Sequence, residues 1–143
     1  MIRFLYIVNK QGQLRVCRYF EYVPDKKRSS LHTSVVRNCL NRNDKQCTFF
    51  EYEDFTVVYR KYVNLYFIAG ITKEENELAV IELIHNFVET LNQYFGKVSE
   101  LDIMYNQDRV YMLIDDMLLN GQAAETSRTR ALVPLQLLDT AKK

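Results

Sequence analysis

The sequence has few of the residues on which catalytic and metal sites depend. Its 143 residues include two histidines, three cysteines, four glycines and no tryptophan. His32 and His85 have no cysteine or carboxylate at the spacing of metal ligands, and the spacings of Cys17, Cys39 and Cys47 match no zinc or redox motif. Four glycines are too few for a glycine-rich loop that holds phosphate. The sequence therefore predicts neither an enzyme nor a protein with a bound cofactor.

No charge of one sign dominates, and no long apolar run is present. Nineteen lysines and arginines stand against eighteen acidic residues, which leaves a net charge of +1. Nucleic-acid-binding domains are usually strongly basic, so we expect no nucleic-acid partner. The longest apolar runs are far shorter than the roughly 20 residues that a membrane-spanning helix needs. The odd number of cysteines favours free thiols over a closed disulfide framework. The length predicts one domain, residues 1–143.

Aromatic residues are abundant. Ten tyrosines and eight phenylalanines lie in a chain that is 48% hydrophobic. Tyrosine has an apolar body and a polar tip, which suits half-buried surfaces and interfaces. The composition is compatible with an aromatic-rich core and equally with an apolar face that meets another protein.

The hydrophobic pattern predicts the element order β-β-α-β-β-β-α-α-α. Strands are expected at residues 2–8, 14–20, 47–53, 55–60 and 62–70, and the first two long helices at about 24–42 and 73–95. The last strand has apolar residues on both alternating faces, so it should be covered on both sides or lie centrally in the sheet. An antiparallel sheet with helices on its faces belongs to the α+β class.

Four local signals give more detailed expectations. Arg15 and Arg18 are three residues apart, which sends them to opposite faces of a regular strand. Ser99 with Asp102 resembles a capping box that begins a short helix. Asn106 is expected to cap the next helix, which closes at 120–121, and Pro134 predicts a kink or break in a later helical segment.

Several segments resemble a known family. The stretch 57–67, VVYRKYVNLYF, closely resembles a signature of the small (sigma) subunits of heterotetrameric clathrin-type adaptor complexes. MIRFLYIVNKQGQLR resembles the N-terminus of that family, IELIHNFVETLNQYFGKVSELDIMYN its long helix and following turn, and IDDMLLNG with ETSRTR its C-terminal part. The resemblance covers essentially the whole chain. CLNRNDKQCTFFEYEDF and RALVPLQLLD are most similar to the sigma subunit of the fourth adaptor complex.

The resemblance implies a fold, a set of partners and a location. The fold is longin-like, with a five-stranded antiparallel sheet flanked by helices. The chain would be one of four, beside two large adaptins and a medium (mu) subunit, in a coat that selects transmembrane cargo into vesicles. It would be cytoplasmic and peripheral on the trans-Golgi network, endosomes and coated vesicles, and the fourth complex acts there without clathrin. The alternative is a free-standing longin-type module of a tethering complex or fusion protein.

The resemblance also implies a groove for cargo tails that carry an acidic dileucine signal. Two aliphatic side chains of such a tail need apolar slots, and its acidic residue needs a cation at the rim. Arg15 matches that cation, with help from an adjoining large subunit. Val63 stands where the family usually has alanine, so the slot gains two methyl groups. Lys97 stands where the family usually has asparagine, so a side chain that can accept a hydrogen bond is replaced by a cation that can only donate. The matching slot positions are Val63, Leu65, Val88, Val98, Leu101 and Ile103. For four of them, Leu65, Val88, Val98 and Leu101, ordinary core packing is the alternative interpretation.

Overall fold

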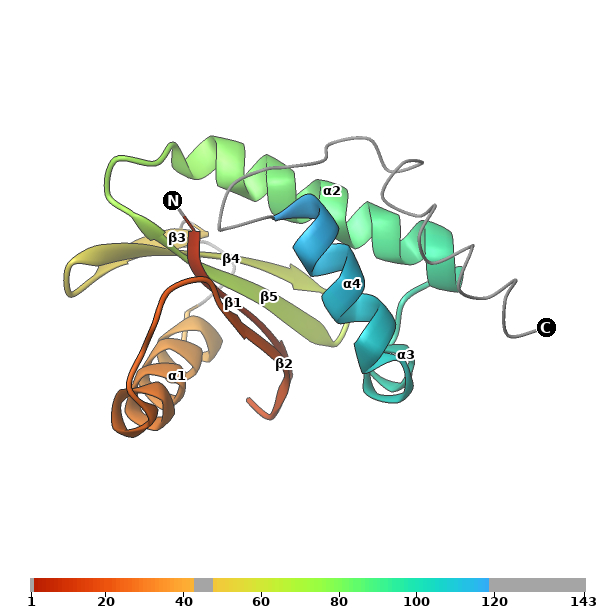
Figure 1. Ribbon diagram of the computed structural model, residues 1–143, viewed down its shortest axis with the longest axis horizontal. Coiled ribbons are helices and arrows are strands. Elements are labelled where there is room, and N and C mark those ends of the chain that lie inside the picture. The colour runs from red at the N-terminus through yellow and green to blue at the C-terminus, as the bar shows by residue number, and fades with distance from the viewer. Residues whose placement is uncertain (1, 43–47, 119–143) are drawn as a thin grey trace.

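The computed structural model describes residues 2–42 and 48–118, and Figure 1 shows their arrangement. The predicted order of five strands and four helices is confirmed within these residues. The strands are β1 (Ile2–Asn9), β2 (Leu14–Tyr19), β3 (Phe49–Tyr52), β4 (Phe55–Tyr62) and β5 (Leu65–Thr72). The helices are α1 (Asp25–Leu40), α2 (Glu77–Phe95), α3 (Glu100–Tyr105) and α4 (Gln107–Met117). None of these helices is long and apolar enough to cross a membrane.

The strands form one antiparallel sheet with helices on both faces. Their order across the sheet is β2-β1-β5-β4-β3, so the first and last of the described strands, β1 and β5, pair at its centre. Helix α1 covers one face, and α2 and α4 cover the other (Figure 1). This arrangement confirms the α+β, longin-like fold with a five-stranded antiparallel sheet.

Alternation along the central strands builds a separate apolar core on each face. In β1, Leu5 and Ile7 join the core under α2–α4, whereas Phe4, Tyr6 and Val8 join the core over α1. Strand β5 divides in the same way and is buried along most of its length. The prediction that this strand is covered on both sides is therefore confirmed.

Gly70 in β5 leaves room for an aromatic ring. It lies opposite Phe4, and a Cβ added to Gly70 would come under 3.0 Å from three carbons of the Phe4 ring. That ring is stacked on Tyr6 with centroids 4.4 Å apart and meets Phe55 edge-on at 5.7 Å. Because its neighbours are closely packed, the ring has little freedom to move away.

The β4–β5 turn and the start of α2 lie later in the chain than the sequence pattern predicts. Strand β4 continues through the two cations to Tyr62, which pairs with Leu65 across a two-residue loop. Val63 begins that loop with φ +52°, a left-handed conformation that is unfavourable for a β-branched residue. Helix α2 begins at Glu77 instead of 73, because the Asn76 side chain caps it by accepting from the Leu78 amide at 3.0 Å.

The caps of the short helices match the sequence only in part. The capping box of Ser99 and Asp102 is confirmed in both directions. Asn106 does precede α4, but its side chain makes no cap and instead donates to the Asp102 carbonyl at 2.9 Å. The expected helix end at 120–121 and the break at Pro134 lie outside the described residues.

Candidate functional site

The residues expected to line a groove fall into a buried set and an exposed set. Leu65, Val88, Val98 and Ile103 are 2%, 0%, 3% and 0% exposed and belong to one apolar cluster beneath α2–α4. Val63 and Leu101 are 56% and 59% exposed, and Lys97 is also exposed. The buried four pack as ordinary core in this conformation, so a ligand would first meet the exposed residues.

Asn92 joins the β4–β5 hairpin to the loop after α2. Its Oδ1 accepts a hydrogen bond from the Tyr62 hydroxyl at 3.1 Å and another from the Val98 amide at 3.0 Å. Val63 follows Tyr62 and Lys97 precedes Val98 in the chain, so Asn92 ties together the two segments that carry these exposed residues. The end of β4, helix α2 and the loop after it are therefore joined through one side chain.

A β-bulge in β2 sets the direction of Arg15. Leu14 pairs with Val8 and Val16 pairs with Ile7, which leaves Arg15 as an extra residue without a partner on β1. After this insertion Arg18 faces the same side, where its Nη2 lies 3.1 Å from an Asp115 carboxylate oxygen on α4. The expectation that Arg15 and Arg18 lie on opposite faces is wrong, because it assumes an uninterrupted strand.

Arg15 is held by a carboxylate at the start of α3. Its Nε donates to Glu100 Oε1 at 2.8 Å, and its Nη2 donates to Gln13 Oε1 at 3.0 Å. The same Glu100 oxygen accepts from Asn9 Nδ2 at 2.9 Å. The hydrogen bonds from Asn9 and Arg15 lower the pKa of the Glu100 carboxyl from its ordinary value. Gln107 adds a bond from its Nε2 to the Arg15 carbonyl at 2.8 Å. Helices α3 and α4 are thus attached to the β1–β2 hairpin.

Helix α3 presents an apolar face beside this ion pair. Leu101, Met104 and Tyr105 are 59%, 38% and 79% exposed, and their i, i+3, i+4 spacing puts them on one side of the helix. Leu101 directly follows Glu100, so exposed apolar surface adjoins a cation and its counter-ion. Such a surface suits a segment that combines aliphatic side chains with negative charge.

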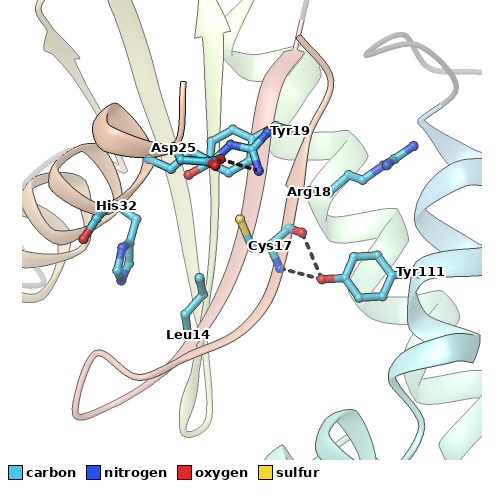
Figure 2. Close-up of a pocket in the computed structure, with 9 residues that line it drawn as sticks. Leu14, Cys17, Arg18, Tyr19, Asp25, His32 and Tyr111 are labelled. Atoms are coloured by element: carbon cyan, nitrogen blue, oxygen red, sulfur yellow. Dashed lines mark hydrogen bonds and ion pairs between the residues drawn. The ribbon is translucent and has the colours of Figure 1, made fainter. Parts of the chain in front are cut away.

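A separate cavity lies between α1 and the edge strand β2, and Figure 2 shows its lining. It has a volume of about 580 Å³. The Tyr111 hydroxyl reaches the strand edge, accepting from the Cys17 amide at 3.0 Å and donating to the Cys17 carbonyl at 2.9 Å (Figure 2). Burial raises the pKa of the Cys17 thiol, which disfavours the nucleophilic thiolate. The cavity therefore has no activated nucleophile at Cys17.

The described residues contain no group of three or more histidine, cysteine, aspartate or glutamate side chains placed to hold a metal ion. Three residues of the candidate site were not expected from the sequence: Asn9, Asn92 and Glu100. Asn92 and Glu100 bond to partners 30 and 85 positions away in the chain. The packing of α2 against β4 brings Asn92 to Tyr62, and the position of α3 beside β2 brings Glu100 to Arg15.

Comparison with known proteins gives one consistent family. The model of the clathrin adaptor complex small chain family matches residues 1–142. The chain is 51% identical to the human AP-4 complex subunit sigma-1 over 139 residues, which cover 97% of this chain and 96% of the relative. It is 45% identical to the AP-4 complex subunit sigma of Arabidopsis thaliana over 140 residues, with 98% of each chain covered.

A more distant relative and a structure agree with these matches. The human AP-1 complex subunit sigma-1A is 37% identical over 139 residues, covering 97% of this chain and 88% of the relative. A chain in a homology model of the full-length AP-3 complex in a stretched open conformation has a TM-score of 0.79 and 28% identity. That match covers 99% of this chain and 95% of the other.

Proposed function

Because the chain belongs to the clathrin adaptor complex small chain family, and is therefore a non-enzymatic small subunit of a vesicle-trafficking adaptor complex, we propose its place and its ligand within that complex. Its partners are two large adaptins and a medium (mu) subunit of an AP-4-type complex. The complex is peripheral on trans-Golgi and endosomal membranes. The family match over residues 1–142 favours this function over a free-standing longin-type module.

The ligand is a cytoplasmic cargo tail with an acidic dileucine signal. The observation that carries this proposal is the position of Arg15 next to the exposed apolar face of α3, through the bond of Arg15 to Glu100. The acidic residue of the tail binds at the guanidinium of Arg15, and its aliphatic residues pack against Leu101 and Val63. The buried residues Val88 and Val98 lie beneath and become ligand contacts only if the groove opens.

The two departures from the family pattern fit this geometry in different ways. Val63 is 56% exposed at the hairpin tip, so its two extra methyl groups add apolar surface at the rim. Lys97 is exposed beside Val98 and places a second positive charge on the loop. A lysine cannot accept a hydrogen bond from a peptide backbone, but it attracts acidic residues of the tail.

A binding experiment with the assembled four-chain complex tests the proposal. Immobilised peptides with an acidic dileucine signal are compared with peptides whose two leucines are replaced by alanine. Arg15→Glu and Leu101→Asp should each abolish the difference while the complex still assembles. Arg18→Glu is the matched control, since Arg18 pairs with Asp115 away from the groove. Leu101 is the better apolar test position than Val88, because a charge at a fully buried residue would unfold the chain.

Unchanged leucine-dependent binding by both Arg15→Glu and Leu101→Asp complexes would remove these residues from the ligand site. The role as an assembled small subunit would stand in that case, since it rests on the family match.

A further inference from the structure

Glu100 already forms an ion pair with Arg15, the cation to which the acidic residue of a cargo tail is proposed to bind. Its Oε1 lies 2.8 Å from Arg15 Nε, and the two side chains keep 29% and 23% of their surface exposed. The pair is therefore reachable from solvent and is neither a core ion pair nor a freely solvated one. A ligand acid that approaches Arg15 must approach this carboxylate as well.

The geometry of the pair leaves part of the guanidinium available. Glu100 binds the Nε side through one oxygen, and Gln13 takes one hydrogen of Nη2. Among residues 2–42 and 48–118, Arg15 Nη1 has no hydrogen-bond partner. A carboxylate or phosphate prefers to bind two guanidinium N–H groups in parallel. Binding at the Nη end would bring a second negative charge close to Glu100, and like charges at such separations repel.

Releasing Glu100 from Arg15 would not dismantle the hairpin. The Glu100 oxygen keeps its bond to Asn9 Nδ2 at 2.9 Å. Asn9 is only 3% exposed, and its Oδ1 accepts from the backbone amides of Gln11 and Gln13 at 3.0 and 2.9 Å. The turn is therefore organised by Asn9, and the ion pair is an exchangeable addition to it.

We propose that Glu100 is an internal counter-ion that competes with the acidic residue of a cargo tail for Arg15, and so determines how much negative charge a tail needs in order to bind. This inference rests on the proposed dileucine function and names the residue that sets its specificity. Repulsion from Glu100 weakens the binding of a tail with one poorly placed acidic residue. A tail with several acidic residues, or with a phosphate, still binds Arg15 despite this repulsion.

The Glu100→Gln variant separates competition from simple positioning. Glutamine keeps an oxygen that can accept from both Asn9 and Arg15, but it removes the charge. The assembled complex is titrated with two dileucine peptides that differ only in glutamate against glutamine at the acidic position. We expect Glu100→Gln to tighten binding of the acidic peptide about threefold or more and to leave the neutral peptide unchanged, since only the former is repelled.

Two further variants serve as controls. Asp115→Asn removes the same charge from the comparable ion pair with Arg18, in which Arg18 Nη2 lies 3.1 Å from Asp115 Oδ1. This variant should change the affinity for neither the acidic nor the neutral peptide. In an Arg15→Gln complex the gain from Glu100→Gln for the acidic peptide should shrink, because the shared cation is absent.

The outcomes distinguish this inference from the function on which it rests. If the wild-type complex binds the acidic peptide and Glu100→Gln weakens or does not change that binding, Glu100 only positions Arg15 and the inference is overturned. If neither the wild-type nor the Glu100→Gln complex binds either peptide, the proposed dileucine function fails and the inference fails with it.

Discussion

Replacing Asn92 by alanine tests how the candidate site is held together. One side-chain oxygen accepts from the Tyr62 hydroxyl at 3.1 Å and from the Val98 amide at 3.0 Å. Tyr62 is half-buried and can bond to water after the change, so that loss is about 1 kcal/mol. Val98 is 3% exposed, and leaving its amide unpaired costs about 1–3 kcal/mol. The total is about 2–4 kcal/mol, concentrated at the loop between α2 and α3.

Amide hydrogen exchange measures this loss where it occurs. With the chain purified together with its large partner subunit, exchange at the Val98 amide should accelerate at least about fivefold in Asn92→Ala, which corresponds to the lower bound of about 1 kcal/mol for that amide. Tyr62→Phe removes only the other bond and should leave exchange at Val98 nearly unchanged. Asn92→Asp keeps an acceptor oxygen and should preserve most of the protection.

Equal protection of Val98 in wild type and Asn92→Ala would refute the reasoning. It would mean that the amide finds another partner and that the loop does not depend on Asn92. An equally large effect of Tyr62→Phe would contradict it in a different way, by showing that the two bonds do not act separately.

Three further predictions follow from packing, backbone strain and burial. Gly70→Ala should destabilise the chain by about 1–3 kcal/mol in urea unfolding, because the new methyl meets the enclosed Phe4 ring, and the loss should be smaller when Phe4 is also reduced to leucine. Val63→Gly should stabilise it by up to about 1 kcal/mol in the same assay, since glycine relieves the positive φ, and a loss of stability would contradict the strain at the hairpin tip. Burial raises the pKa of the Cys39 thiol to about 12, above its ordinary value of 9.0, so this thiol stabilises the fold fully below pH 9 and the contribution is lost as pH rises toward 12. Iodoacetamide at pH 9 should therefore label Cys39 only after unfolding, while the half-buried Cys17 reacts slowly in the folded chain, as peptide mass spectrometry would show.

The sequence was sufficient to predict the elements and their order. The continuous apolar runs of β1 and β5 follow from burial on both faces of a sheet, and that physics is local. The capping box of Ser99 and Asp102 was predictable for the same reason, because its partners are three residues apart. The groove residues came from family resemblance, which gave their positions but not their exposure.

Register and long-range partners were beyond the sequence pattern. A single extra residue in β2 puts Arg15 on the same side of the sheet as Arg18, and no local pattern in the sequence predicts that bulge. The end of β4 was also misplaced, since pairing with β5 carries Lys61 and Tyr62 into the strand despite the adjacent charges. Glu100 has no local signal of its role in the sequence, because its partner Arg15 is 85 positions away.

Quantitative affinity purification of this chain from its native cell most directly tests the central claim, that it is the small subunit of an adaptor complex. We expect two large adaptins and one medium subunit in amounts equal to the tagged chain, with AP-4-type subunits in preference to those of the other complexes. Recovery of the chain as a folded species that binds no adaptin would contradict the account.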